Sequence, residues 1–448
     1  MNNNGLTEKP IPGLVRKIAI PASIGFFFNT MYNVVDTYYA GFISTEAIAA
    51  LSVSFPVFFI IIALGSGVST GATALISNAL GEGSKKKATL YSTQAISFGI
   101  LLSIVLTIVG LVISPPLFRL LGAEGNYLTI SLQYIYIIFF GTIFFIGTYI
   151  LNAPLQAQGD TKTLRNILVL GFFLNLLLDP WFIYGGFGIP AMGITGVALA
   201  TVIIQLISAI YLLTKVLKTG ILTKESWSEL KPRKKEFIDI AKQGLPAGLN
   251  MMTVAVGIFI ITFFVSWFGP AAVAAYGIAT RIEQIALMPT IGLNIATLTL
   301  VGQNNGAKKY DRVKETLSTS IKIGLAIMAV GMIVVFFFAR QLMAFFTKDT
   351  AVIDIGTPYL KIAVFIFFAY LFLFVNVSAL QGVKKPMFAL WMGLYRQILG
   401  PLVIYWIFAV YFGIFGIWYG VFVVTWSAAI ISILYTRHVM KHKLYKQN

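Results

Sequence analysis

Long apolar runs alternate with short polar segments along the whole chain. A membrane-spanning helix needs about 20 mostly apolar residues, and twelve runs reach that length. The first six are expected at 14–41, 47–78, 88–115, 125–156, 162–186 and 192–215. The second six are expected at 238–268, 272–303, 315–341, 354–381, 386–412 and 414–436. The runs lack the strict alternation of barrel strands, so they predict an all-α integral membrane protein with twelve transmembrane helices.

Positive charge lies on one side of this topology. Of the 33 Lys and Arg residues, 26 fall in the two termini and in five polar segments, while the opposite loops carry three. The five segments are 79–90, 157–165, 215–242, 303–314 and 382–386. Loops rich in Lys and Arg stay in the cytoplasm, so we expect a multi-pass protein of the cytoplasmic (inner) membrane with both termini cytoplasmic. The net charge of +17 is then an orientation signal, and we expect no nucleic-acid partner.

The second half of the chain repeats the first at an offset of 223 to 225 residues. The matching pairs are Ile62-Ala63-Leu64 with Ile285-Ala286-Leu287, Gly83-Ser84-Lys85-Lys86 with Gly306-Ala307-Lys308-Lys309, Gln158-Gly159 with Gln381-Gly382, and Pro21 with Pro246. Six spans in each half give both halves the same orientation, which makes a parallel repeat. The repeat predicts two pseudo-symmetric six-helix bundles, an N-lobe at 1–214 and a C-lobe with a basic cytoplasmic tail at 238–448, joined by a cytoplasmic linker at 215–237.

The residue types present exclude several classes of function. Charged residues make up 11% of the chain, against about 25% in soluble domains, so most of the surface faces lipid. Cys is absent, which excludes disulfides, thiolate metal sites and Cys nucleophiles. The two His residues, His438 and His442, lie in the basic tail. We therefore expect no enzyme, no cofactor and no resident metal.

Three acids stand within apolar runs: Asp36, Asp179 and Glu283. A charged side chain at mid-bilayer costs about 2.5–3.5 kcal/mol on insertion scales, so each must be paired, hydrated or protonated. Asn29, Asn33 and Asp36 are spaced i, i+4, i+7 and share one helix face. Polar side chains on one face of the first span predict a functional surface.

Asn175 and Asp179 are spaced i, i+4 in the fifth span, and Pro180 follows them and removes a backbone donor. If the first and fifth spans meet, these residues and Asp36 surround one small cavity. Two close carboxylates resist simultaneous ionisation, so the pair can take up a proton. The same oxygens can instead hold Na⁺, and a structural pair of carboxylates capped by amides is the third interpretation.

Glu283 follows Arg281 by two positions, and residues so spaced point apart on a helix. Arg281 is then free to face Arg396 or a carboxylate across a cleft between the lobes. Packing inside a lobe is the alternative for each of these side chains. The candidate substrate-cavity residues are Asn29, Met31, Tyr32, Asn33, Arg281, Glu283 and Arg396.

Taken in order, the motifs of the chain resemble those of the multidrug and toxic compound extrusion (MATE) transporters. They are Pro21, Asp36, Gly81 to Gly83, Gln158-Gly159-Asp160, Asp179-Pro180, Met288-Pro289 with Gly292, Gly302-Gln303-Asn304 and Leu380-Gln381-Gly382. The likeness extends over nearly the whole chain. It implies a V-shaped pair of six-helix bundles that exports bulky cationic or amphipathic compounds, driven by re-entry of H⁺ or Na⁺.

The resemblance also implies a coupling site in the N-lobe. Asp36, Asp179 and Asn175 look like the cation site of the DinF-like branch, and Asn152 and Thr201 stand where that site draws further polar ligands. The NorM-like branch places acids within the seventh and tenth spans, whereas here those spans carry acids only at their ends. A C-lobe sodium site of the NorM type is therefore not expected.

The predicted mechanism is antiport through Asp36. A cation that binds Asp36 and Asp179 from outside neutralises them, the first span bends near Pro21, and the drug leaves the repacked cavity. Pro180 is a second candidate hinge. We expect a monomer in the lipid bilayer, because a two-lobe chain can work alone.

A flippase for lipid-linked saccharides on a related two-lobe fold is the alternative. Arg281 and Arg396 would then bind the pyrophosphate of the lipid carrier. A membrane-embedded enzyme fits less well, because the predicted spans contain no His and no acid-rich metal motif.

Overall fold

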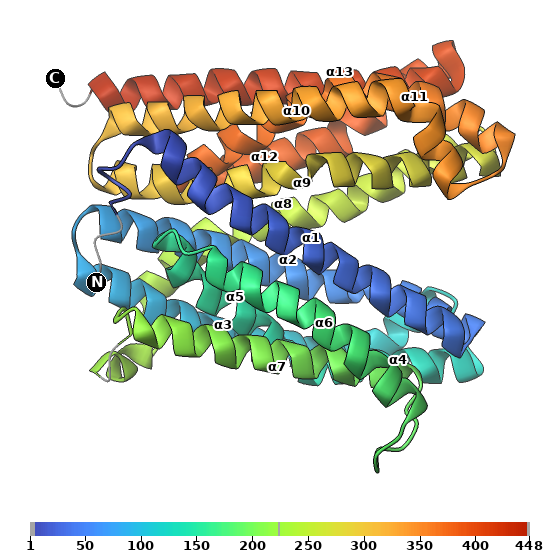
Figure 1. Ribbon diagram of the computed structural model, residues 1–448, viewed down its shortest axis with the longest axis horizontal. Coiled ribbons are helices and arrows are strands. Elements are labelled where there is room, and N and C mark those ends of the chain that lie inside the picture. Colours follow the sequence, from blue (N-terminus) through green and yellow to red (C-terminus); the bar gives the residue numbers. More distant parts are fainter. Residues whose placement is uncertain (1–4, 223–224, 446–448) are drawn as a thin grey trace. The chain divides into compact units, whose positions relative to one another are not determined.

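The computed structural model describes residues 5–222 and 225–445, and the regular structure of these residues is helical (Figure 1). The first half contains α1 (Ile11–Ile43), α2 (Thr45–Gly81), α3 (Lys85–Leu120), α4 (Gly125–Phe140), α5 (Thr142–Ala157), α6 (Lys162–Tyr184) and α7 (Ile194–Lys218). The 3-10 helix η1 (Glu225–Leu230) precedes the second half. That half contains α8 (Lys234–Ser266), α9 (Pro270–Gly306), α10 (Tyr310–Phe346), α11 (Thr350–Gly382), α12 (Met387–Leu394), the π-helical turn η2 (Tyr395–Leu399) and α13 (Gly400–Tyr445).

The helices reproduce the twelve predicted spans. In the described part of the chain, ten helices are long and apolar enough to cross a membrane, and the bent pair of α4 and α5 adds one more. One of the ten is the run Met387–Lys441, which loses helical geometry at Gly413, where φ is 59° and ψ is −143°. Its two parts are the predicted runs 386–412 and 414–436. The all-α membrane fold is thus confirmed.

The run predicted as one span at 125–156 is two helices. α4 and α5 meet at an angle of 42° around Gly141. A Cβ atom at Gly141 would lie 2.9 Å from Cγ1 of Val202 in α7, so only glycine lets the bend approach that helix. Hydropathy could not reveal the bend, because both helices are apolar.

The described residues form two compact units. The first comprises residues 24–248, and the second comprises residues 5–23 together with 249–445. The boundaries therefore fall inside α1, after Ser23, and inside α8, after Gly248. Each unit has its own buried apolar core, built mainly by α2, α3, α4, α5 and α7 in the first and by α9, α10, α11 and α13 in the second.

Glycines bring helices into close contact in the first unit. A Cβ atom at Gly71 of α2 would lie 2.5 Å from the backbone nitrogen of Gly244 in α8, and one at Gly248 would lie 3.0 Å from the Ala63 carbonyl oxygen. Small residues that let backbones touch are the usual basis of helix packing in membranes, where dispersion replaces the hydrophobic effect. The start of α8 is thereby fixed against α2.

The N-terminal residues belong to the second unit through backbone contacts. Arg312 of α10 donates from Nη2 to the Lys9 carbonyl at 2.7 Å, and Ser23 Oγ donates to the Pro289 carbonyl at 3.4 Å. A Cβ atom at Gly292 of α9 would overlap the Ala19 carbonyl oxygen. Because these partners come from distant parts of the sequence, hydropathy could not assign residues 5–23 to this unit.

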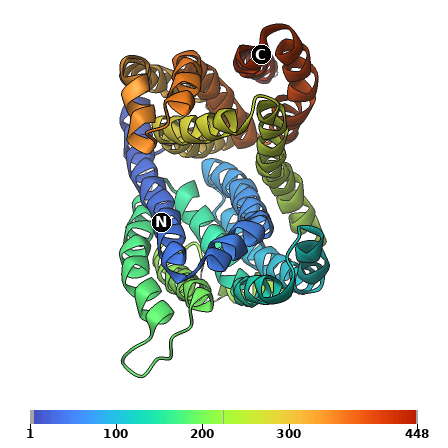
Figure 2. The ribbon, with the colours of Figure 1, turned by 90° about the vertical axis from the view of Figure 1, so that its right-hand side faces the viewer.

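The surface of the helices is largely apolar. Val112 of α3 is 69% exposed and Phe337 of α10 is 70% exposed, as expected for side chains that face acyl chains instead of water. The loop 185–193, between α6 and α7, projects beyond the helix ends (Figures 1 and 2). Phe187, in this loop, is 99% exposed.

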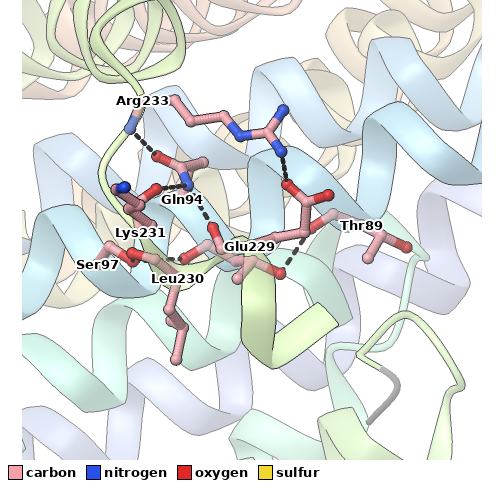
Figure 3. Close-up of polar contacts among 8 residues, drawn as sticks. Thr89, Gln94, Ser97, Glu229, Leu230, Lys231 and Arg233 are labelled. Atoms are coloured by element: carbon pink, nitrogen blue, oxygen red, sulfur yellow. Dashed lines mark hydrogen bonds and ion pairs between the residues drawn. The ribbon is translucent and has the colours of Figure 1, made fainter. Parts of the chain in front are cut away.

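A buried glutamine of α3 holds the segment that connects the two halves (Figure 3). Gln94 Nε2 donates to the carbonyl oxygens of Glu229 and of Lys231, the latter at 2.9 Å, and Gln94 Oε1 accepts from the Arg233 backbone nitrogen at 2.9 Å. The side chain is 0% exposed. One residue of the first unit thus satisfies three backbone groups at the end of η1.

Replacing this residue should loosen the connecting segment. We expect Gln94→Leu to lower the free energy of unfolding by about 1–3 kcal/mol, because three backbone groups lose their partner. Trypsin should then cut after Arg233 about tenfold faster, which corresponds to about 1.4 kcal/mol. Ser97→Ala is the graded control, since Ser97 Oγ donates to only one carbonyl of the segment, that of Leu230 at 2.6 Å, and otherwise to the Thr93 carbonyl of its own helix at 3.3 Å. Equal cleavage of Gln94→Leu and wild type would contradict the prediction.

Candidate functional site

The second part of α1 and helix α6 run side by side in the first unit (Figure 1). A Cβ atom at Gly25 would lie 3.1 Å from Cα of Arg165, so glycine permits the backbones to approach. Further along both helices, Tyr39 Oη donates to the Leu176 carbonyl at 3.4 Å. The later contact on α1 pairs with the later contact on α6, so the two helices run in the same direction. The first and fifth predicted spans therefore meet.

An amide and two carboxyl groups form the centre of this contact. Asn175 Nδ2 of α6 donates to Asp36 Oδ1 of α1 at 2.8 Å. One turn along α6 lies Asp179, which is 0% exposed, as is Asn175. The carboxyl groups of Asp36 and Asp179 are close enough to share a hydrogen bond when one of them is protonated. The structure thus brings together the three residues that spacing singled out.

The centre contains hydrogen-bond acceptors without donors. Both carboxyl oxygens of Asp179 and the Oδ1 atom of Asn175 are buried and receive no hydrogen bond in the structure. Buried polar atoms are nearly always paired, and an exception calls for an explanation such as an ion or a proton. Three acceptors that lack donors, beside a further carboxylate, suit a bound cation.

Tyrosines surround the carboxyl pair. Tyr32, one turn before Asp36 on α1, is 9% exposed and lies near Thr201 of α7. Tyr134 of α4, which is 6% exposed, lies near both carboxyl groups. The Thr201 hydroxyl itself donates to the Val197 carbonyl at 3.0 Å. Tyr134 was not among the site residues predicted from the sequence. The sequence feature that could have indicated it is a polar hydroxyl inside the apolar run 125–156.

The remaining N-lobe candidates have hydrogen bonds of their own or differ in burial. Asn152 of α5 is buried; its Nδ2 atom donates to Gln156 Oε1 at 3.3 Å, and its Oδ1 atom has no hydrogen-bond partner among the described residues. Asn33 is exposed and donates to the Asn29 carbonyl of its own helix at 2.8 Å. Met31 is partly buried. Among the described residues, no hydrogen bond joins these side chains to Asp36 or Asp179.

Both predicted hinges lie inside continuous helices. Pro21 is within α1, two residues before the unit boundary at Ser23, and Pro180 is within α6, next to Asp179. A proline leaves one carbonyl of the preceding turn without its helical donor, which makes that turn easier to bend. Pro21 therefore stands where α1 passes from one unit to the other.

The second unit contains a separate buried carboxylate. Glu283 of α9 is 6% exposed, and its Oε2 atom accepts from Tyr359 Oη of α11 at 2.9 Å. Its Oε1 atom has no hydrogen-bond partner. Trp418 of α13 packs edge-on against Tyr359, with ring centroids 4.6 Å apart. Tyr359, itself packed against Trp418, thus holds one oxygen of this acid.

The two arginines named from the sequence have different surroundings. Arg281 is exposed, while Glu283 is buried, so the two point apart as expected. The guanidinium of Arg396 lies over the ring of Tyr370, 5.1 Å from its centroid, and 5.8 Å from that of Phe374. Arg396 belongs to η2, and π-helical turns are frequent at functional sites. Among the described residues, neither arginine forms an ion pair.

The chain matches one protein family twice. The profile of the MatE family covers residues 21–181 and 246–406. The two matches are offset by 225 residues, which confirms the internal repeat. Each match begins at a proline of the predicted repeat, Pro21 or Pro246.

Similar proteins are named as a multidrug resistance protein or as transporters. A probable multidrug resistance protein of Bacillus subtilis, YoeA, is 28% identical over 77% of this chain and 74% of its own length. A FAD transporter of Shewanella oneidensis is 27% identical over 89% of this chain and 88% of its own. Among solved structures, the outward-facing conformation of a multidrug resistance MATE family transporter of the MOP superfamily superposes with a TM-score of 0.91 at 24% identity, covering 99% of both chains.

Proposed function

Because the chain belongs to the MatE family of membrane transporters, we propose that it is a secondary antiporter that exports cationic or amphipathic organic compounds in exchange for protons. The observation that carries the proposal is the pair of the partly buried Asp36 and the buried Asp179, whose oxygens outnumber the donors around them. An enclosed pair of acids must gain a cation to become neutral. Such a pair is suited to accept the coupling ion, and it supports assignment to the DinF-like branch.

Proton uptake is the preferred coupling event. A single proton between Asp36 and Asp179 supplies the missing donor and removes one buried charge without any further ligand. Na⁺ would need several oxygens at once, and the contacts of the centre offer Asp36, Asp179 and Asn175. We therefore propose H⁺ as the coupling ion, with Na⁺ at the same three residues as the alternative.

The coupling step is carried by α1. When Asp36 is ionised, it accepts the Asn175 amide and binds α1 to α6. Neutralisation weakens this charge-assisted bond, which frees the second part of α1 to bend near Pro21 and repack the N-lobe cavity. At 100 mV the membrane potential contributes about 2.3 kcal/mol per charge, and a one-unit pH gradient adds about 1.4 kcal/mol.

The topology completes the proposal. We propose an inner-membrane protein with both termini in the cytoplasm, which acts as a monomer. The proposed N-lobe at 1–214 and C-lobe at 238–448 are the two halves of the sequence repeat, whereas the compact units divide inside α1, after Ser23, and inside α8, after Gly248. Lys and Arg on one set of loops support this orientation. We also propose that the candidate substrate residues named from the sequence, including Arg281 and Glu283, contact the transported compound.

Dye uptake into inverted vesicles tests the ion and the substrate class together, because an exporter moves its substrate into the lumen of such vesicles. Ethidium is added outside, and a pH gradient or a Na⁺ gradient is imposed separately, with the ion concentrated in the lumen. We expect the pH gradient alone to drive movement of the dye. If only the Na⁺ gradient moves the dye, the coupling ion at this site is Na⁺ and not H⁺. If neither gradient moves the dye, the proposal that the protein exports organic cations is wrong.

A second substrate class has one specific observation in its favour. One relative that matches most of the chain is named a FAD transporter, and FAD carries a pyrophosphate. Arg281 and Arg396 would serve such an anion, as they would serve a lipid-linked saccharide in the flippase alternative. Arg396 is already stacked on aromatic rings, which suits it to planar groups. Uptake of FAD or of a lipid-linked pyrophosphate in place of ethidium would favour this class.

A further inference from the structure

A basic cavity opens at one end of the second unit, where α10 begins and α13 approaches its end. Its volume is about 530 Å³, and side chains of α10, α11 and α13 line it. The residues that line it are far in sequence from Asp36, Asn175 and Asp179, which form the acidic centre of the first unit. None of the residues proposed for coupling or substrate binding lines it.

Two rows of residues give the cavity its charge. Lys314, Ser318 and Lys322 follow one another at i, i+4, i+8 on α10, and Arg437 and Lys441 are spaced i, i+4 on α13. Such spacing puts each row on one helix face. All four cations are exposed, and no acid is among the described residues that line the cavity. The rows thus form a strongly positive site.

Three of these cations have no carboxylate partner. In the described part of the chain, Lys314, Lys322 and Arg437 form no ion pair. Asp311 and Lys314 are spaced i, i+3 and share a face of α10, but no ion pair joins them in the described part of the chain; Glu315, the next residue, points away. The positive charge is therefore available to a ligand.

The rest of the lining is apolar. It consists of Leu317, Ile321, Phe372, Ile433 and Met440, together with the buried amide of Asn376. The amide of Asn376 donates to the Phe372 carbonyl at 2.7 Å, so it is satisfied within α11. An inorganic anion would leave this apolar wall without a partner. A ligand that fills the cavity needs an anionic head and a hydrocarbon part.

The cavity lies at the depth where such a ligand occurs. With 37 residues, α10 is about 55 Å long, whereas the hydrocarbon core is about 30 Å thick. Its ends therefore reach the headgroup region. Lys314 is near the start of α10, and Lys322 is two turns deeper, about 12 Å along the axis. The site extends from the headgroups toward the acyl chains.

We propose that this cavity binds one anionic phospholipid of the leaflet that it faces. The phosphate lies between Lys314, Lys322 and Arg437, and an acyl chain covers the wall formed by Ile321 and Phe372. Basic pockets between membrane helices are suited to anionic headgroups. By the distribution of charge along the chain, this leaflet is the cytoplasmic one.

Lipid binding to the purified full-length protein tests the site. The protein in neutral detergent is titrated with phosphatidylglycerol or with phosphatidylcholine of the same acyl chains, and bound lipid is counted by native mass spectrometry. We expect phosphatidylglycerol to be retained and to raise the melting temperature, with little effect of phosphatidylcholine. The double variant Lys322→Gln/Arg437→Gln should bind phosphatidylglycerol about thirtyfold more weakly, from about 1 kcal/mol per charge.

The matched control removes two charges elsewhere. Lys85→Gln/Lys86→Gln makes the same change on α3, where both side chains are exposed and lie outside the cavity. It should bind phosphatidylglycerol as wild type does. Equal retention of both lipids, or equal loss in both double variants, would overturn the proposal. Displacement of the lipid by millimolar inorganic phosphate would also overturn it, since the site would then serve a soluble anion.

Discussion

Asp36→Asn is expected to abolish gradient-driven efflux while the protein remains folded in the membrane. The amide keeps the size of the side chain and an oxygen for the Asn175 donor, which lies 2.8 Å from Asp36 Oδ1. It cannot gain or lose a proton, so the cycle between charged and neutral states stops. Gradient-driven uptake of ethidium into inverted vesicles should fall to the level of vesicles without the protein, under either gradient.

Asp354→Asn is the control for this substitution. Asp354 forms an exposed ion pair with Arg340 at 2.7 Å, and such pairs contribute about 0–1 kcal/mol. Its efflux should equal that of wild type. Elution of Asp36→Asn as one folded species on size-exclusion chromatography separates a lost function from a lost fold. A folded Asp36→Asn protein that exports the dye at the wild-type rate would contradict the antiport scheme.

Hydropathy predicted most of the fold, because lipid imposes a simple rule. Backbone groups in the bilayer must be satisfied within a helix, so each apolar run becomes a helix whatever its other contacts. The break at Gly413 also followed, since it separates two runs of sufficient length. What hydropathy could not provide was the bend at Gly141 or the membership of residues 5–23 in the second unit. Both depend on contacts between residues distant in sequence.

The centre of the site was predictable for a related reason. Acids are costly in a membrane, so Asp36 and Asp179 stood out, and helical spacing linked Asp179 to Asn175. Tyr134 did not stand out, because tyrosine is common in apolar spans and its role depends on what it faces. The basic cavity was hidden as well, since its two rows are about 120 residues apart in the sequence and their lysines resemble ordinary ends of spans.

Asp179→Asn is expected to stop transport and, at the same time, to stabilise the protein. Both carboxyl oxygens of Asp179 are buried without a donor, and a buried group without a partner costs about 1–3 kcal/mol. An amide at this position removes the charge and supplies a donor toward Asp36. The melting temperature should rise by about 2–4 °C per kcal/mol for a unit of this size, while efflux falls to background.

Two controls separate this effect from a general change in packing. Asp179→Ala removes the same charge but leaves a cavity, so its gain in melting temperature should be smaller or reversed. Asp239→Asn alters an acid that already accepts from Tyr91 Oη at 3.0 Å, so no gain is expected there. If Asp179→Asn instead lowers the melting temperature, the carboxylate stabilises the native fold and its role is structural. A rise in stability without loss of efflux would place the coupling step on Asp36 alone.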